Sequence, residues 1–158
     1  MLPITPLTPA AQEEVRRFIE AQWGADHVVA HGRVFYPHEL AGAAAREAGA
    51  LVGLITWHIA GATCEIVTLD SLRPGTGLGT ALIEAARAAA RAAGCSRLWL
   101  ITTNDNLEAL RFYQKRGFQL ARLHRDALAE SRRLKPNIPL VGAHGIPLRD
   151  ELELEQAL

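Results

Sequence analysis

A glycine cluster at Gly75, Gly77 and Gly79 most constrains what this chain can fold into. Residues 63–72, before the cluster, are rich in β-branched and aliphatic side chains and predict a strand. The alanine-rich run after it predicts a long helix that ends before Gly94. Glycines at alternate positions let backbone N–H groups approach an anion, and a helix start adds unpaired donors and a positive dipole end. The cluster therefore predicts a phosphate or pyrophosphate site.

Two nucleotide-binding loops do not fit this cluster. A P-loop needs a lysine followed by Ser or Thr after its last glycine, whereas Thr80 and Ala81 follow Gly79 and no lysine is near. A dinucleotide fingerprint reads G-x-G-x-x-G with an acidic residue about 20 positions later. Here the third glycine comes one position early, and residues 95–99 contain no acid. For the cluster alone, a tight turn that binds no ligand stays an alternative.

The remaining segments predict one mixed α/β domain over residues 1–158. Thr8 and Pro9 suit a helix start, and Gly24 suits its end. Gly61 predicts the turn of a hairpin. Residues 27–36 predict a weak strand that runs into a loop, and residues 41–50 are mostly alanine and glycine near a turn. The predicted helices are 10–23, 106–116 and 127–134, and the predicted strands are 51–59, 63–72, 97–103, 118–123 and an edge-like last strand at 150–156.

Composition narrows the partners and the compartment. Lysine plus arginine equals aspartate plus glutamate at 17 each, which gives no support for a nucleic-acid or membrane-surface partner. Cys64 and Cys95 show no CxxC spacing and are expected to be reduced, as in a cytoplasmic protein. The first residues lack a basic stretch followed by an apolar run, and no run of about 18 apolar residues predicts a transmembrane helix.

A second motif lies about 30 residues after the glycine cluster. Residues 106–118 read N-x-x-A-x-x-F-Y-x-x-x-G-F. Together with the cluster, this motif resembles the two signatures of the GNAT superfamily of N-acetyltransferases, most clearly over residues 63–120. The usual first signature has Arg or Gln immediately before the first glycine, but here Pro74 takes that place and Arg73 precedes it. The resemblance implies a mixed, mostly antiparallel sheet flanked by helices and acetyl-CoA as co-substrate.

The resemblance also implies a set of cofactor-binding residues. Leu69, Ser71 and Leu72 would pair their backbone with the pantetheine arm as an added strand does, and Arg73 follows them. Asn106 would bond the arm, and Tyr113 would lie near its sulfur. The pyrophosphate would be bound by the backbone amides of Gly75, Thr76, Gly77, Leu78, Gly79 and Thr80.

Acyl transfer to an amine needs a neutral amine, a stabilised carbonyl oxygen and a proton for the departing thiolate. Tyr113, with a reference pKa of about 10, is the candidate acid. Glu65, on the strand before the cluster, is the first candidate base, and we expect it to share a face with Val67 and Leu69. Asp70 is the second candidate base, and a water chain is a third possibility. Neither cysteine has a base near it in sequence, so direct transfer in a ternary complex is expected.

Several alternatives stay open at this point. A non-catalytic acyl-CoA-binding or sensing domain would have the same glycine turn. The acceptor amine is undetermined among a peptide, an amino acid, a polyamine and an antibiotic. His27, His31, His38 and His58 are expected on the acceptor side without metal-ligand spacing, so no metal is predicted. The role of residues 136–151 stays open: residues 144–151 either close over the acceptor pocket, with Arg149 or Glu151 touching the substrate, or form a packed connection to the last strand. The oligomeric state is also open, and addition of the last strand to a partner's sheet would give a homodimer.

Overall fold

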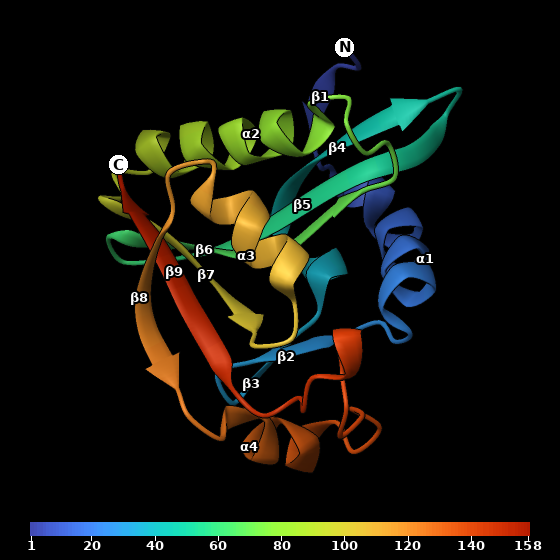
Figure 1. Cartoon of the computed structure of the whole chain (residues 1–158). Helices are drawn as coiled ribbons and strands as arrows, with labels where there is room; N and C mark the ends of the chain where they lie inside the picture. The colour runs from blue at the N-terminus through green and yellow to red at the C-terminus, as the bar shows by residue number, and fades with distance from the viewer. The chain divides into compact units, whose positions relative to one another are not determined.

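The computed structural model describes residues 1–158 as two compact units. The first unit comprises residues 1–28, 35–98 and 158, and the second comprises residues 29–34 and 99–157. The first contains β1 (Ile4–Pro6), α1 (Gln12–Trp23), β4 (Ala41–Glu47), β5 (Ala50–Ala60), β6 (Thr63–Ser71) and α2 (Leu78–Ala92). The second contains α3 (Leu107–Gln114), β8 (Gln119–His124), α4 (Ala127–Leu134) and β9 (Glu151–Ala157). The strands β2 (Val28–Ala30), β3 (Arg33–Phe35) and β7 (Arg97–Thr103) have residues in both (Figure 1).

The sheet of the first unit has the order β1-β4-β5-β6, and each neighbouring pair is antiparallel. The predicted hairpin is confirmed as β5 and β6, with Gly61 at its turn in a left-handed conformation. The amide of Ser96, just before β7, donates to the carbonyl of Ala62, just before β6, at 2.8 Å. The first residues of β7 therefore run parallel to β6, which makes the sheet mixed, as predicted.

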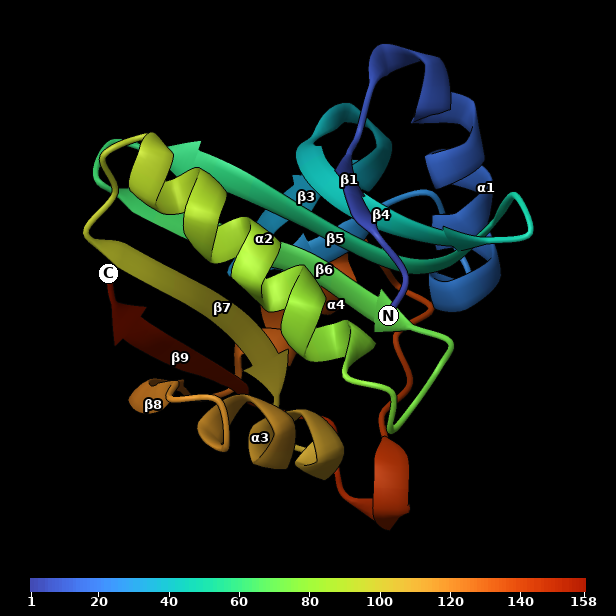
Figure 2. The ribbon, with the colours of Figure 1, turned by 90° about the horizontal axis from the view of Figure 1, so that it is seen from above.

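Helices cover both faces of this sheet. Gly53 and Leu54 are consecutive on β5, so their side-chain positions point to opposite faces. A Cβ at Gly53 would lie 2.9 Å from Leu78 of α2. Leu54 instead belongs to a buried cluster with Val15, Phe18 and Ile19 of α1, and with Ala44 and Leu51. We call the two sides the α2 face and the α1 face. Figure 2 shows α2 lying along β5 and β6.

β4 is a strand that the sequence analysis did not predict, because alanine and glycine are poor strand formers. Its residues are small because little space surrounds them. Ala43, Ala44 and Ala45 are at most 3% exposed. A Cβ at Gly42 would lie 2.3 Å from the carbonyl oxygen of Ile55 and 2.8 Å from Leu7. Close packing, and not strand propensity, therefore selects these residues.

In the second unit the strand order is β7-β9-β8, which corrects the prediction that the last strand is an edge. β9 lies between its neighbours, with Glu151 and Leu154 buried. The alternating charges of β9 suggested an exposed edge strand. Instead, the Glu153 carboxylate lies 3.0 Å from the Nε2 atom of His124 on the neighbouring strand β8. The edge strand is β8, where Leu120 and Leu123 are 56% and 57% exposed. The predicted helices at α3 and α4 are confirmed.

The predicted first helix is also confirmed, with a different start. Residues Pro9–Ala11 form a 3₁₀ turn before α1, and the Thr8 side chain makes no capping hydrogen bond. Gly24 ends α1 in the left-handed conformation, at φ 79°. The predicted weak strand at residues 27–36 is a two-stranded sheet of β2 and β3. None of the helices combines the length and hydrophobicity needed to cross a lipid bilayer.

The contacts of Gly42 give a testable prediction about stability. Gly42→Ala should lower the free energy of unfolding by about 1–3 kcal/mol or more, because the new methyl group meets backbone atoms. The matched control is Gly61→Ala, whose Cβ has open space and meets only left-handed strain of about 1–2 kcal/mol. Urea denaturation of both variants measures the difference. A Gly42→Ala variant as stable as the wild type would contradict the steric explanation of β4.

Candidate functional site

The glycine turn joins β6 to α2 inside the first unit. Gly75 and Gly77 have φ values of 75° and 82°, a conformation that residues with a Cβ seldom adopt. Gly77 is the N-cap of α2, and no side chain caps this helix. A Cβ at Gly75 would meet no atom within 4 Å, so the turn is open there. The turn is closed by Thr76, whose hydroxyl donates to the carbonyl of Arg73 at 2.6 Å.

The start of α2 offers a row of backbone donors. The amide of Ala81 donates to the carbonyl of Gly77 at 3.0 Å, as in a regular helix. The amides of Leu78, Gly79 and Thr80 precede that bond, so no carbonyl of α2 lies in register to accept from them. These donors add to the positive end of the helix dipole. These are the residues to which the sequence analysis assigned a pyrophosphate, and that assignment stays a prediction.

Arg73 is held on one side of the turn. Its guanidinium donates to Glu47 at 3.0 Å from Nε and 2.5 Å from Nη2, and to the carbonyl of Leu72 at 2.9 Å. Arg73, Glu47 and Thr76 line a cavity of about 370 Å³, together with Met1, Leu2 and Leu78. The guanidinium charge at the turn is thus shared with a carboxylate from the β4–β5 hairpin.

The backbone of β6 shows which residues suit an added strand. The amide of Leu72 donates to the carbonyl of Val52 on β5 at 2.8 Å. In an antiparallel pair, alternate residues direct their N–H and C=O groups to opposite sides. Leu69 and Ser71 therefore direct these groups away from β5, as the pantetheine prediction requires. The amide of Leu72 is already bonded to β5, so that part of the prediction is wrong.

A bulge in β6 changes the predicted face of Glu65. Thr56 is paired with Thr68, but Trp57 is paired with Ile66, which leaves Val67 as an extra residue. Glu65 is consequently paired with His58, and it does not share a face with Leu69 as predicted. The α1 face of the hairpin includes the side chains of Leu54, Thr56, His58, Glu65, Thr68 and Asp70.

The two candidate bases differ in their surroundings. Glu65 is only 3% exposed, whereas Asp70 is partly buried at the end of β6. Both carboxylate oxygens of Asp70 accept from the indole N–H of Trp23, at 3.1 and 3.0 Å. Burial raises the pKa of Asp70, and the Trp23 hydrogen bond opposes this shift. Between the two acids, the buried hydroxyls of Thr56 and Thr68 are hydrogen-bonded at 2.6 Å.

In the second unit, Asn106 begins α3. Its side-chain oxygen accepts from the amide of Ala109 at 3.2 Å, so it is the N-cap. The two residues before it hold a distant segment. Asn104 donates to the carbonyl of Pro147 at 2.9 Å and accepts from the amides of Arg149 and Asp150. Asp105 accepts from the amide of Ala143 at 2.8 Å.

Tyr113 lies on α3, seven residues after the cap, and is 9% exposed. Its ring packs edge-on against Phe112 and Phe118, with centroids 5.3 and 5.4 Å apart. The guanidinium of Arg116 stacks on the Phe112 ring, with its central carbon 3.6 Å from the ring centre. The aromatic packing fixes the direction of the Tyr113 ring.

The C-terminal segment is tied down by hydrogen bonds within the second unit, as the alternative of a packed connection to the last strand expects. Glu151 is 2% exposed, and its two oxygens accept from the amide of His31 at 3.1 and 3.2 Å. Arg149 binds the carboxylate of Asp150 at 2.8 and 2.9 Å. His144 binds Glu108 of α3 at 2.7 Å. Glu151 is therefore committed to the fold, and it is not placed to contact a substrate.

Three of the four predicted histidines belong to the first unit. His27 and His38 both contact the Tyr36 ring, with centroids 5.8 and 6.0 Å away. His58 contacts Phe35 at 5.9 Å. His31 belongs to the second unit, where it contacts Trp99. No group of three or more His, Cys, Asp and Glu side chains is placed to hold a metal ion.

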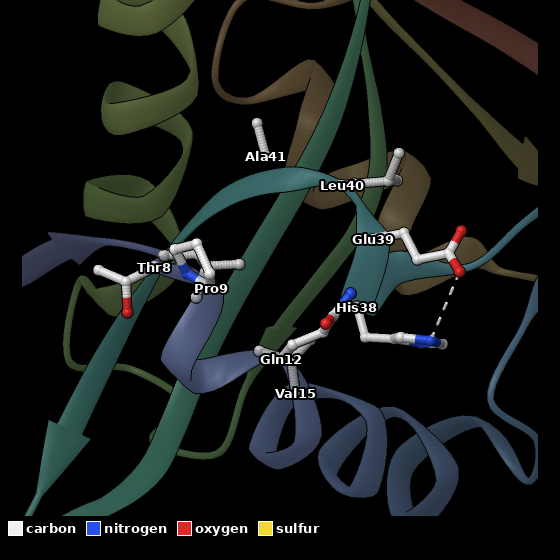
Figure 3. Close-up of a pocket in the computed structure, with 9 residues that line it drawn as sticks. Thr8, Pro9, Gln12, Val15, His38, Glu39, Leu40 and Ala41 are labelled. Atoms are coloured by element: carbon white, nitrogen blue, oxygen red, sulfur yellow. Dashed lines mark ion pairs between the residues drawn. The ribbon is translucent and has the colours of Figure 1, made fainter.

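A second cavity of about 290 Å³ lies beside the start of α1. Figure 3 shows its lining from the turn before α1 and from residues 38–41, with His38 and Glu39 4.0 Å apart. The lining residues are Leu7, Thr8, Pro9, Gln12, Val15, His38, Glu39, Leu40 and Ala41. They include His38, one of the histidines expected on the acceptor side, but none of the predicted catalytic or cofactor-binding residues.

Comparison with known proteins places the chain in a family. Residues 7–118 match the Acetyltransferase (GNAT) family. The chain belongs to the GNAT acetyltransferase family. It is 42% identical to the uncharacterized protein YdhI of Bacillus subtilis strain 168 over 153 residues, which cover 96% of each chain.

Solved structures of GNAT proteins share its fold at low sequence identity. An IAA acetyltransferase from Bacillus cereus superposes with a TM-score of 0.71 at 21% identity, covering both chains completely. A Bacillus subtilis acetyltransferase that was solved in complex with CoA superposes with a TM-score of 0.68 at 19% identity, covering 100% of this chain and 99% of the other. The predicted fold class is confirmed.

The predicted site residues divide between the two units. Glu65 and residues 69–80 lie in the first unit, whereas Asn106 and Tyr113 lie in the second. The sequence analysis missed Trp23, which contacts Asp70 from 47 positions away. Its only signal in the sequence was its place at the end of the first helix, before Gly24.

The environment of Asp70 predicts how stability depends on pH. A folded-state pKa above the unfolded value means that the folded protein binds more protons, so stability falls as pH rises from the unfolded value, about 3.9, through the folded one. Asp70→Asn removes the titrating carboxyl and therefore this fall in stability with pH. Its amide oxygen is still able to accept from the indole N–H of Trp23. Its free energy of unfolding, relative to the wild type, should therefore increase with pH over that window.

Asp26→Asn is the matched control for this measurement. The His27 hydrogen bond lowers the pKa of Asp26. The wild type should therefore gain stability relative to Asp26→Asn as pH rises through the lowered folded pKa to the unfolded value of about 3.9, which is the opposite sign. Urea denaturation at pH values from about 2 to 8 measures both differences. A pH-independent difference for Asp70→Asn would contradict the burial of this carboxylate.

Proposed function

We propose that residues 1–158 act as one N-acetyltransferase domain that moves an acetyl group from acetyl-CoA to a primary amine by direct transfer. Membership of the GNAT family supports the acyl donor, and the observation that carries the proposal is the open glycine turn before an uncapped helix. The turn supplies backbone donors and a positive dipole end without any lysine, which suits a pyrophosphate. Leu69 and Ser71 direct backbone groups away from β5 and are the residues proposed to pair with the pantetheine arm.

The cysteines support direct transfer without an acyl-enzyme. Cys64 is completely buried, and burial raises the pKa of its thiol to about 12. A thiol with this pKa is almost entirely protonated near neutral pH, and the thiolate is the nucleophile. Cys95 is 6% exposed. The acceptor amine is therefore proposed to attack the thioester itself, in a ternary complex.

Tyr113 is the proposed acid for the departing thiolate. A phenol with a reference pKa of about 10 is protonated at neutral pH and is able to donate to a thiolate whose conjugate thiol has a pKa of about 8.5. The side-chain oxygen of Asn106 caps α3, so its amide nitrogen is the group proposed to bond the pantetheine arm. Glu65 remains a candidate base that acts through water, because its carboxylate is buried.

Binding of acetyl-CoA to the helix start gives a prediction with a size-matched, uncharged control. Thr80 is exposed in the first turn of α2. Thr80→Glu should weaken acetyl-CoA binding by about tenfold or more, because a carboxylate there opposes the pyrophosphate, although it favours the helix. Thr80→Gln has nearly the same size without the charge and should bind within about threefold of the wild type.

Calorimetric titration measures these affinities, with NAD and ATP as controls for a nucleotide-binding protein. Specific acetyl-CoA binding in the micromolar range is expected, at about −8 kcal/mol. A wild type that binds neither acetyl-CoA nor longer acyl-CoAs would contradict the proposal. Equal acetyl-CoA affinities for Thr80→Glu and Thr80→Gln would show that the helix start is not part of the acetyl-CoA site.

Tyr113→Phe separates catalysis from binding. The variant keeps the aromatic packing against Phe112 and Phe118 and loses only the hydroxyl. Turnover should fall by about 100-fold or more, because a general acid contributes at least that much, while acetyl-CoA affinity stays within about threefold. Release of the CoA thiol measures turnover. Unchanged turnover would exclude Tyr113 as the acid, and a wild type that binds acetyl-CoA without acetylating any amine would favour the non-catalytic alternative.

A further inference from the structure

Asp70 has surroundings that a structural carboxylate does not need. It is paired with Leu54 on β5 and shares the α1 face with it, at the end of β6. The indole N–H of Trp23, the last residue of α1, bridges its two oxygens. Gly24 ends α1 immediately afterwards, which fixes the indole at the helix terminus.

No cation compensates the Asp70 charge. Trp23 is its hydrogen-bond partner, and no Lys, Arg or His forms an ion pair with it. By contrast, the buried Asp150 binds the guanidinium of Arg149. A partly buried carboxylate without a cation costs stability, and an asparagine would accept from Trp23 equally well. Groups held in such destabilising surroundings are typical of functional sites.

The position of Asp70 along β6 connects it with the proposed acyl donor, and this step rests on the proposed function. Leu69 and Ser71, on either side of Asp70, are the residues that direct backbone groups away from β5. Side chains alternate along a strand, so the Asp70 carboxylate projects from the α1 face between these two backbone positions. Asp70 and Gly75 are five positions apart, at most about 16 Å along the chain, which an extended pantetheine arm is able to span.

We propose that Asp70 receives the ammonium group of the acceptor and removes its proton, and that Trp23 positions the carboxylate for this step. The nitrogen lone pair then forms the N–C bond to the thioester carbonyl as the C–S bond breaks. A second proton from the nitrogen balances the departing thiolate, by way of the acid. The amide keeps the third, and Asp70 releases the first to solvent. Asp70 is thus a catalytic residue, and Trp23 is a positioning residue.

Glu65 fits this role less well, although it shares the α1 face. It is paired with His58 farther along the hairpin, and only 3% of it is exposed. An acceptor ammonium is unable to contact it directly. Asp70 is more accessible, because it is only partly buried.

The first measurement follows the indole N–H resonance of Trp23 by NMR while n-butylammonium is added to the CoA-saturated protein. Trp23→Phe identifies this signal among the three tryptophans. We expect a saturable shift in the wild type and in the control Asp126→Asn, and no shift in Asp70→Asn. A wild type whose Trp23 signal does not respond would overturn the proposal.

The second measurement is kcat/KM for n-butylamine at saturating acetyl-CoA. Asp70→Asn should lose 100-fold or more near neutral pH, in the range of general-base effects, with acetyl-CoA affinity unchanged. Its residual rate should rise about tenfold per pH unit towards the amine pKa, about 10.4 for a lysine-like amine, because only neutral amine then reacts. Asp126→Asn should match the wild type. An Asp70→Asn variant within threefold of the wild type would overturn the proposal while leaving the proposed function intact.

Trp23→Phe tests the positioning role by its pH profile. Loss of the N–H donor should move the acidic limb of kcat/KM to higher pH, because that hydrogen bond lowers the pKa of Asp70. The other titratable and charged groups on α1, β5 and β6 are unchanged in this variant; they are Glu13, Glu14, Arg16, Arg17, Glu20, His58, Cys64 and Glu65. A rate that falls equally at every pH would show that Trp23 only supports the fold. A wild type that does not bind acetyl-CoA would instead contradict the proposed function.

Discussion

The pairing of β5 with β6 decides which side of the sheet each side chain of the candidate site faces. Because side chains alternate, a slip of one residue would move the whole set to the other face. The buried hydrogen bond between Thr56 and Thr68 holds the register, since a slip would leave two buried hydroxyls without partners at about 1–3 kcal/mol each. The extra residue Val67 then moves Glu65 to the α1 face. The face on which Glu65 and Asp70 lie thus depends on a pair of hydroxyls that take no part in the proposed reaction.

At the end of β6, the two faces of the sheet favour ligands of opposite charge. On the α2 face, the chain continues into a helix start whose amides favour an anion. On the α1 face, Asp70 offers a carboxylate without a cation. A single strand end is thus suited to a phosphate-bearing group and an ammonium group approaching from different sides. If the two proposed ligands bind there, the sheet separates them, and they do not compete for the same groups. The carboxylate lowers stability above its pKa.

The sequence predicted local features well, because turns and helix ends depend on nearby residues. Gly61, Gly75 and Gly77 take the conformations that their positions require, and Asn106 caps the helix that its motif predicted. Features set by distant contacts were missed. β4 is a strand because Gly42 and its alanine neighbours fit against β5, whatever their propensity. The contact of Trp23 with Asp70 joins residues 47 positions apart, and no local pattern reports it.

The loop before α3 shows what distant anchoring does to a binding segment. Asn104 and Asp105 hold a segment that lies 38 to 46 positions later in the chain, and Glu108 holds His144. The conformational entropy of the loop that carries Asn106 is therefore lost when the chain folds. A ligand that reaches Asn106 has less disorder to remove, so its association there is expected to show a smaller entropy loss than binding to a mobile loop.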